Sequence, residues 1–180
     1  MGAFILGDLS SVAASLRPDL LAEPTRAALS RAGLFDDVGI VEIDPALSDT
    51  ASTQQAFGLQ PEVLANCVIV AGKREGDERL ASCVALSNTR VDVNGFVRRH
   101  LDVRKASFLP TERAVALTAM EYGGITPIGL PADWPVLVDL RVVQTPVVVI
   151  GSGVRRSKIL LPGTLLARLP GVEVIDGLAV

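Results

Sequence analysis

The sequence contains few of the side chains on which hydrolytic enzymes usually depend. Its 180 residues include one histidine and two cysteines. A Ser/His/Asp or Cys/His site would have to use His100, which follows Arg98 and Arg99 in a segment that we expect to be an exposed helix. One histidine and two cysteines in apolar segments also cannot complete a zinc ligand set. The sequence therefore predicts neither a resident metal ion nor a histidine-dependent nucleophile.

Long apolar runs and targeting signals are also missing. No apolar run reaches the roughly 18 residues needed to span a bilayer, although the mean hydropathy is +0.42. The first residues lack the basic region of a secretory signal, and Leu6 departs from the myristoylation pattern. Cys67 and Cys83 are too few for a disulfide scaffold. We therefore expect a cytoplasmic protein with no membrane partner.

The charge balance excludes one class of nucleic-acid partner. The chain has 17 basic and 20 acidic residues and a net charge of −3, so we expect no binding of duplex DNA by bulk charge. The basic residues are nevertheless clustered. Segment 90–105 has five basic residues against two acidic ones, and Arg155, Arg156 and Lys158 follow one another closely. Two interpretations stay open for these clusters, a solvated surface or a contact with single-stranded nucleic acid.

The hydrophobic pattern predicts a mixture of strands and helices. Apolar runs predict strands over residues 38–43, 63–71, 80–86, 105–108, 136–139, 142–143, 147–150, 159–161 and 172–175. Spacings of three and four predict two short helices within 9–31 and helices over 48–57 (capped by Asp49 or Ser48), 91–101, 111–120 (capped by Thr111) and 165–169. Several successive strands lie too close together for helical crossovers. The expected fold is α+β, a single domain over residues 1–180 with a mixed, largely antiparallel curled sheet and flanking helices.

The strands over 63–71 and 80–86 are expected to pair as a hairpin, because only the short polar turn 73–78 lies between them. A turn centred near Glu75 would place Cys67 opposite Cys83. In a reducing compartment, two opposed thiols in apolar strands are better explained as buried side chains than as a redox bridge.

Two features are not explained by an apolar core. Asn66 interrupts an apolar strand, and a buried amide without partners costs about 1–3 kcal/mol, so we expect it to be half-exposed or to face a polar pocket. The loop 123–127 (Gly-Gly-Ile-Thr-Pro) has two adjacent glycines, which permit a positive φ and close approach of a ligand to bare backbone. Its amide and carbonyl groups can hold a carbonyl group or a ribose. An ordinary tight turn is the alternative.

A third motif, residues 149–156, begins like a dinucleotide-binding loop that follows a strand. Gly151 and Gly153 occupy the first two glycine positions, but Arg156 occupies the third. The sequence therefore predicts no nucleotide cofactor.

The order of these motifs resembles the YbaK/prolyl-tRNA synthetase-associated editing family over about residues 38–178. The shared features are the apolar strand at 66–70 with its hairpin return, the basic helix ending in Arg104-Lys105-Ala106-Ser107-Phe108, the helix 112–118 and the loop 123–129. Val138-Asp139, Gly151-Ser152-Gly153 and the strand 159–161 before a final helix continue the pattern.

This resemblance implies a domain that hydrolyses the ester bond of mischarged aminoacyl-tRNA, mostly proline tRNA, in trans and without a metal ion. In the family the glycine loop contacts the aminoacyl end and helps to position the attacking water. A lysine on the first hairpin strand lies near the terminal nucleotide of the tRNA, and Asn66 occupies the matching position here. Asparagine can donate a hydrogen bond but has no positive charge for a phosphate.

The residues and the resemblance together assign three groups of site residues. Those expected to act in catalysis are Gly123, Gly124 and Asn66. Those expected to bind the substrate are Ile125, Thr126, Pro127, Asp139, Gly151, Ser152 and Gly153. Those expected to contact tRNA are Arg98, Arg99, Arg104, Lys105, Arg155 and Arg156. The expected partner is the acceptor end of aminoacyl-tRNA, and an aminoacyl-tRNA synthetase stays open as a second partner.

The changed lysine position leaves a second hypothesis open. A non-catalytic module could keep the pocket and bind tRNA, a nucleotide or an amino-acid-like ligand. The high apolar fraction and low net charge are also compatible with a structural protein that forms oligomers. A further open question is whether residues 1–37 cap the pocket or pack behind the sheet.

Overall fold

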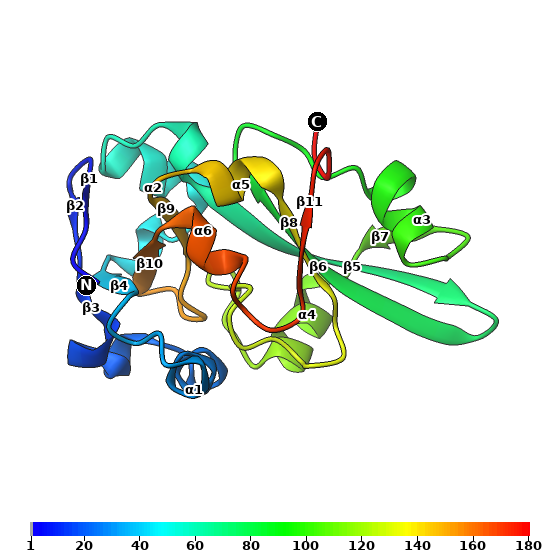
Figure 1. The fold of residues 1–180 in the computed structure, drawn as a ribbon, viewed down its shortest axis with the longest axis horizontal. Coiled ribbons are helices and arrows are strands. Elements are labelled where there is room, and N and C mark those ends of the chain that lie inside the picture. Colours follow the sequence, from blue (N-terminus) through cyan, green and yellow to red (C-terminus); the bar gives the residue numbers. More distant parts are fainter. Residues whose placement is uncertain (1) are drawn as a thin grey trace.

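The computed structural model describes residues 2–180, which form two main β-sheets that meet at one junction (Figure 1). The smaller sheet has the order β3-β4-β10-β9, and the larger has the order β11-β8-β6-β5-β7. Their strands are β3 (Val12–Ala13), β4 (Gly39–Glu42), β5 (Ala65–Arg74), β6 (Asp77–Leu86), β7 (Ala106–Phe108), β8 (Val136–Asp139), β9 (Val148–Gly151), β10 (Ser157–Leu161) and β11 (Val172–Ile175). A separate ribbon pairs β1 (Ile5–Leu6) with β2 (Leu9–Ser10). The predicted α+β class is confirmed.

The hairpin of β5 and β6 is long and projects from the rest of the molecule (Figure 1). Glu75 and Gly76 form its two-residue turn with φ values of +53° and +93°, as in the type I′ turns that match strand twist. The turn is therefore centred between these residues rather than on Glu75, and Cys67 lies opposite Val84. The expected pairing of Cys67 with Cys83 is wrong by one residue. That shift places the two thiols on opposite faces of the hairpin.

Strand pairing within the larger sheet is mixed. β7 is antiparallel to β5, and β5 is antiparallel to β6, whereas β8 is parallel to both β6 and β11. All pairings in the smaller sheet are antiparallel. Parallel neighbours need long connections, and the segment 87–135 with its helices supplies the connection between β6 and β8.

One predicted strand is a helix in the structure. Residues 142–143 lie within α5 (Leu140–Gln144), where Val142 is fully buried. The Asp139 carboxylate accepts a hydrogen bond from the Arg141 amide and caps this helix. Capping and burial outweigh the strand preference of the two valines, because that preference depends on how the side chain packs.

The other predicted helices are present with shifted ends. They are α2 (Thr50–Ala56), α3 (Arg98–His100), α4 (Thr111–Thr118) and α6 (Gly163–Leu166). A π-helical turn, Val93–Val97, precedes α3 and is capped by the Asp92 carboxylate. Asp49 caps α2 as expected, but Pro110 rather than Thr111 is the N-cap of α4. None of the helices within residues 2–180 has the length and apolar character required to cross a membrane.

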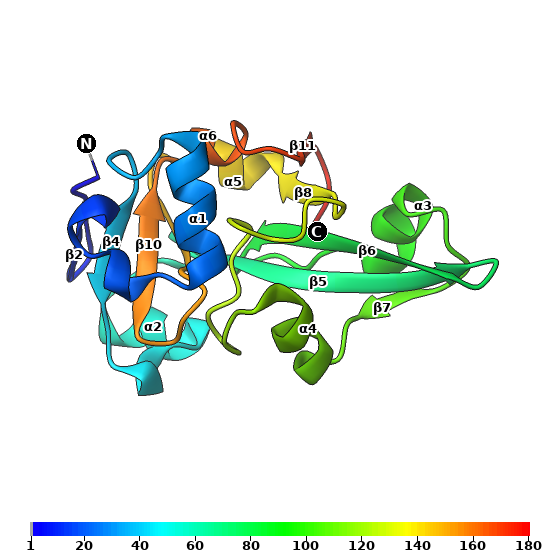
Figure 2. The same ribbon diagram turned by 90° about the horizontal axis from the view of Figure 1, so that it is seen from below.

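The N-terminal region departs furthest from the prediction. Instead of two short helices within 9–31, the chain forms β2, β3, two 3₁₀ turns and one α-helix, α1 (Glu23–Ala32). Pro24 lies in the first turn of α1, where the missing N–H removes no hydrogen bond. α1 covers one side of the smaller sheet (Figure 2), and its Leu29 is fully buried. Within residues 2–37, β3 forms the edge of the smaller sheet and α1 packs against one side of it, and none of these residues lines the cavity described below.

The two sheets meet where β5 begins. Leu64 forms a parallel bridge with Val149 of β9. One apolar cluster contains buried residues of both sheets, among them Val84 and Val138 of the larger sheet and Ile40 of the smaller. The sheets therefore share a core, and the first residues of β5 lie beside β9.

Hydrogen bonds to Asp139 hold the C-terminal segment against the end of β8. Its carboxylate, 1% exposed, accepts hydrogen bonds from Arg141 Nε at 2.8 Å and from the Ala179 amide at 2.9 Å. Burial alone would raise the pKa of this carboxyl, but the hydrogen bonds from Arg141 and Ala179 outweigh it and the pKa is lowered. Asp139 therefore has a structural role in the larger sheet.

We expect Asp139→Asn to lower the free energy of unfolding by about 2 kcal/mol near neutral pH, because hydrogen bonds to a charged group are weakened. The folded-state pKa of Asp139 is lowered. Its stabilisation is therefore present above the unfolded-state pKa of about 3.9 and is lost as the pH falls through the folded-state value. Urea unfolding at neutral and strongly acidic pH measures the difference in unfolding free energy between wild type and variant. This gap should become smaller in acid. An equal gap under both conditions would contradict this role.

Candidate functional site

A cavity of about 410 Å³ opens at the junction of the two sheets. Its walls come from segments far apart in the sequence: the start of α2, the first residues of β5, the strands β9 and β10, and the loop after α4. The predicted site residues that line it are Asn66, Gly123, Ile125, Gly151 and Arg155. Asn66 and the glycine loop therefore share one cavity.

Asn66 reaches the cavity from β5 with its amide held in place. Thr50, the first residue of α2, donates through Oγ1 to Asn66 Oδ1 at 2.7 Å. The amide nitrogen of Asn66 donates to no acceptor within residues 2–180, so it is available to a ligand. Asn66 is exposed at the cavity wall, which agrees with the expectation that its amide is not buried in the apolar core.

Gly123 and Gly124 differ in what their missing side chains allow. Gly123 lines the cavity with a φ of +79°, and a Cβ there would lie 3.0 Å from the Arg155 guanidinium and 3.1 Å from Ser48 Oγ. Gly124 is buried, and a Cβ on it would lie 2.6 Å from the Val154 carbonyl oxygen. Of these two glycines, Gly123 is therefore the one that leaves bare backbone beside the cavity. At Gly124 the missing side chain allows the chain to pack on itself.

The glycine loop is held by the segment that follows β9. Gly153 donates its amide to the Gly124 carbonyl oxygen at 2.7 Å, and the Arg155 amide donates to the Glu121 carboxylate at 2.6 Å. A Cβ at Gly151 would lie 2.4 Å from the Gly124 carbonyl oxygen, closer than side chains approach a backbone. The wall of the cavity is therefore built from direct backbone contact.

This arrangement leaves hydrogen-bond donors without partners at the cavity. The amides of Gly123 and Ile125 donate to no protein acceptor in the part of the chain that the structure describes. Ser48 also lines the cavity, and its buried hydroxyl has no partner among residues 2–180. Fixed donors of this kind stabilise the oxygen of a carbonyl group or an oxyanion when one is bound against them.

Lys158 also lines the cavity, although its sequence neighbours indicate only a basic surface cluster. It lies on β10 between buried Ser157 and Ile159, is 8% exposed, and donates from Nζ to the Ser48 carbonyl oxygen at 2.6 Å. Burial lowers its pKa to about 8, while the nearby Asp49 acts in the opposite direction. A lysine within an otherwise buried strand is the sequence signal that identifies it, because lysine is rarely buried without a partner or a function.

The cavity contains a thiol that is not activated. Cys67 lines the cavity, and its Sγ lies 3.2 Å from Ser82 Oγ. Burial raises the pKa of Cys67 to about 12, so the thiol stays protonated near neutral pH. The charged groups in the wall include two cations, Lys158 and Arg155.

Five of the predicted substrate-binding residues lie outside the cavity wall. They are Thr126, Pro127, Asp139, Ser152 and Gly153. Asp139 holds the C-terminal segment, and the buried Ser152 hydroxyl is 2.7 Å from the Ser157 hydroxyl. Ser152 thus helps to hold the loop that joins β9 to β10, whereas Asp139 acts at the end of β8.

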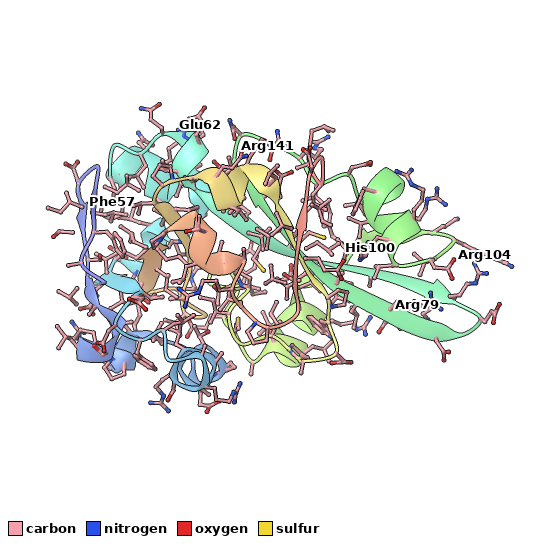
Figure 3. The ribbon with its side chains drawn as sticks, in the orientation of Figure 1. Phe57, Glu62, Arg79, His100, Arg104 and Arg141 are labelled. Atoms are coloured by element: carbon pink, nitrogen blue, oxygen red, sulfur yellow. The ribbon has the colours of Figure 1, made fainter. Side chains whose placement is uncertain are left out.

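Among the residues predicted to contact tRNA, Arg155 alone lines the cavity. The remaining five are Arg98, Arg99, Arg104, Lys105 and Arg156. Figure 3 shows Arg104 at the end of the molecule near the hairpin tip, far from α2. Arg156 instead donates to the Asp19 carbonyl oxygen. These five residues therefore do not share the cavity with Asn66 and the glycine loop.

Comparison with known proteins gives one family and several similar structures. A family model described as the aminoacyl-tRNA editing domain matches residues 44–169, more than two thirds of the chain. No curated protein sequence matches. The crystal structure of a proposed trans-editing enzyme for prolyl tRNA synthetase has a TM-score of 0.71 and 22% identity, over 86% of this chain and 94% of that one. The hypothetical protein APE2540 has a TM-score of 0.73 and 18% identity, over 88% of this chain and 100% of its own. These structures share the fold described above.

We expect Gly151→Ala to lower the free energy of unfolding by about 2 kcal/mol, because the added methyl group meets the Gly124 and Ile125 carbonyl oxygens. Gly33→Ala is the control. A Cβ at Gly33 would meet no atom within 4 Å, and the φ of +66° there makes the change cost about 1 kcal/mol. Urea unfolding of the three proteins measures the difference. A Gly151→Ala variant as stable as wild type would disprove the close contact between the loop and β9.

The buried lysine gives a second prediction. The chain has three lysines, Lys73, Lys105 and Lys158. In protein labelled with ¹³C-lysine, we expect the ε-methylene signal of Lys158 to titrate near pH 8 because burial lowers its pKa, whereas a solvated lysine titrates near 10.4. Since the folded-state pKa is the lower one, this group makes the protein more stable as the pH rises from about 8 towards about 10. Lys158→Met assigns the signal, and titration above pH 10 would contradict the lowered pKa.

Proposed function

The chain belongs to the aminoacyl-tRNA editing domain family, and we propose that it hydrolyses the ester bond of mischarged aminoacyl-tRNA in trans. One observation carries this proposal: Asn66, the Gly123 backbone and Lys158 line the same cavity. The volume of about 410 Å³ falls within the range of roughly 300–1,000 Å³ found for small-molecule sites. It is sufficient for an aminoacyl group and its ribose.

Hydrolysis in this cavity depends on fixed donors rather than on a side-chain nucleophile. Water attacks the acyl carbon, and negative charge develops on the carbonyl oxygen. The bond to the ribose oxygen then breaks, and the proton given up by the attacking water is passed through solvent to that oxygen, which leaves a free amino acid and a ribose hydroxyl. The Gly123 and Ile125 amides and the Ser48 hydroxyl are unpaired donors for the developing charge. One such donor contributes about 10²–10³ to kcat in well-studied hydrolases, so backbone groups are adequate for this chemistry.

Lys158 supplies the positive charge that Asn66 lacks. Both residues line the cavity, from different strands. One proton of the Lys158 ammonium is used by the Ser48 carbonyl oxygen, and two are left to donate. In the proposed complex Lys158 contacts the phosphate of the terminal nucleotide, with Arg155 beside it. The free amide nitrogen of Asn66 donates to the ribose or the aminoacyl group.

The substrate proposed here is an amino acid wrongly attached to proline tRNA. This part of the proposal is supported by the similar structure described as a trans-editing enzyme for prolyl tRNA synthetase. The cavity wall includes Leu64, Ile69 and Leu109, which favour an uncharged aminoacyl side chain. The proposed partners are accordingly the acceptor end of this tRNA and, in the second place, its synthetase.

A panel of mischarged tRNAs, including several amino acids on proline tRNA, tests the activity through release of the amino acid. We expect release from at least one member. Lys158→Met should lower kcat/KM by about 10- to 100-fold, because hydrogen bonds from a charged group are lost. Lys73→Met is the matched control, since Lys73 is exposed on β5 and does not line the cavity. Its kcat/KM should stay close to the wild-type value.

A double variant tests whether β5 can supply the positive charge in place of β10. Asn66→Lys in the Lys158→Met background should recover part of the lost rate, because it returns an ammonium group to the same cavity from β5. No release from any tRNA at micromolar protein would contradict hydrolysis. Saturable tRNA binding without release would instead favour a binding module, the second candidate, to which the asparagine at position 66 points.

A further inference from the structure

Within residues 2–180, exposed aromatic side chains occur at a single place on the molecule. Of the seven aromatic residues in the chain, Phe108 is 56% exposed and Tyr122 is 63% exposed. Both line the cavity. The other five are buried or half-buried in the structure. Because a globular protein gains by burying such rings, their restriction to one cavity indicates a ligand that covers them.

Tyr122 belongs to a rigid arrangement with Arg155. The Arg155 guanidinium carbon lies 6.0 Å from the centroid of the Tyr122 ring. The same guanidinium donates to the carbonyl oxygens of Tyr122 at 3.1 Å and Pro45 at 3.0 Å, and the Arg155 amide is bound to Glu121. An anchored cation therefore covers part of the ring, and the exposed part remains available for stacking.

Phe108 has no structural reason to be exposed. It is the last residue of β7, an edge strand of the larger sheet, where it lies opposite Val70. Edge strands normally carry charged or polar residues at exposed positions, because an exposed apolar edge promotes pairing with other chains. The next residue, Leu109, is buried and lines the cavity floor with Ile69 and Ala114. The chain thus buries one apolar side chain and leaves the neighbouring ring at the rim.

We propose that Phe108 and Tyr122 form a stacking platform for the 3′-terminal adenine of tRNA, an assignment that rests on the proposed function. Proteins bind single-stranded nucleic acid by combining aromatic rings with basic side chains. Arg155 and Lys158 supply the basic groups at this cavity. A terminal base is joined to the ribose that carries the ester. A platform for it must therefore border the cavity that receives the ester, as these two exposed rings do.

An uncharged tRNA with 2-aminopurine at its 3′ terminus tests the platform, because stacking quenches the fluorescence of this base. Binding to the wild-type protein should quench the signal. Phe108→Ala and Tyr122→Ala should each weaken binding by about 5- to 150-fold, the range for loss of one stacked base. Tyr122→Phe keeps the ring and should bind like wild type. Leu117→Ala is the matched control, since Leu117 is 44% exposed and lies outside the cavity wall.

The quench does not require an ester, so its result is separate from that of the deacylation assay. Quenching by a wild-type protein that releases no amino acid would retain the platform and remove the proposed hydrolysis. Loss of the quench in the Phe108→Ala/Tyr122→Ala double variant, with an unchanged unfolding midpoint, supports the platform. Wild-type affinity and quenching in that double variant would overturn it. Deacylation by a wild-type protein that shows no quench would also overturn it, while leaving the proposed hydrolysis in place.

Discussion

The backbones of the glycine loop and of the segment after β9 are in direct contact, and the geometry of the cavity depends on that contact. The Gly153 amide binds the Gly124 carbonyl oxygen at 2.7 Å, and Gly151 leaves no room for a side chain against the same oxygen. Two residues after Gly153, the Arg155 amide donates to the Glu121 carboxylate. This hydrogen bond fixes the backbone from which the Arg155 side chain extends. Donors that belong to such a wall do not have to be ordered when a ligand binds, which is the advantage of a preorganised site.

The second determinant is the position of the positive charge. β5 and β10 belong to different sheets, and both reach the cavity, so a cation can come from either wall. In this chain β5 contributes the uncharged Asn66 and β10 contributes Lys158. The Ser48 carbonyl oxygen holds the ammonium in the cavity. Burial of this group lowers its pKa to about 8, so its charge is more sensitive to pH than that of a solvated lysine.

Location matters more than number for the aromatic residues. A content of 4% suggests little capacity to stack nucleic-acid bases. The tertiary structure nevertheless places both exposed rings at the cavity, one of them backed by Arg155. Arg104, which follows α3, lies at the far end of the molecule near the hairpin tip (Figure 3). The basic residues of segment 98–105 are therefore separate from Arg155 and Lys158, the cations that line the cavity.

The sequence by itself determined the features that depend on neighbouring residues: the hairpin, its polar turn, the Asp49 cap and the helix–strand mixture. It also marked Asn66 and the paired glycines, because each breaks a local rule. Predictions from local pattern were wrong where tertiary packing determines the structure. One case is the register of Cys67 in the hairpin. The other is α5, whose valines are helical because Asp139 caps the helix and Val142 is buried. Only the tertiary structure showed that Gly123 lines the cavity while Gly124 is buried, and that Lys158 lies in the cavity wall. The Lys158 contact joins residues 110 positions apart, and such contacts depend on how the two sheets pack rather than on any local pattern.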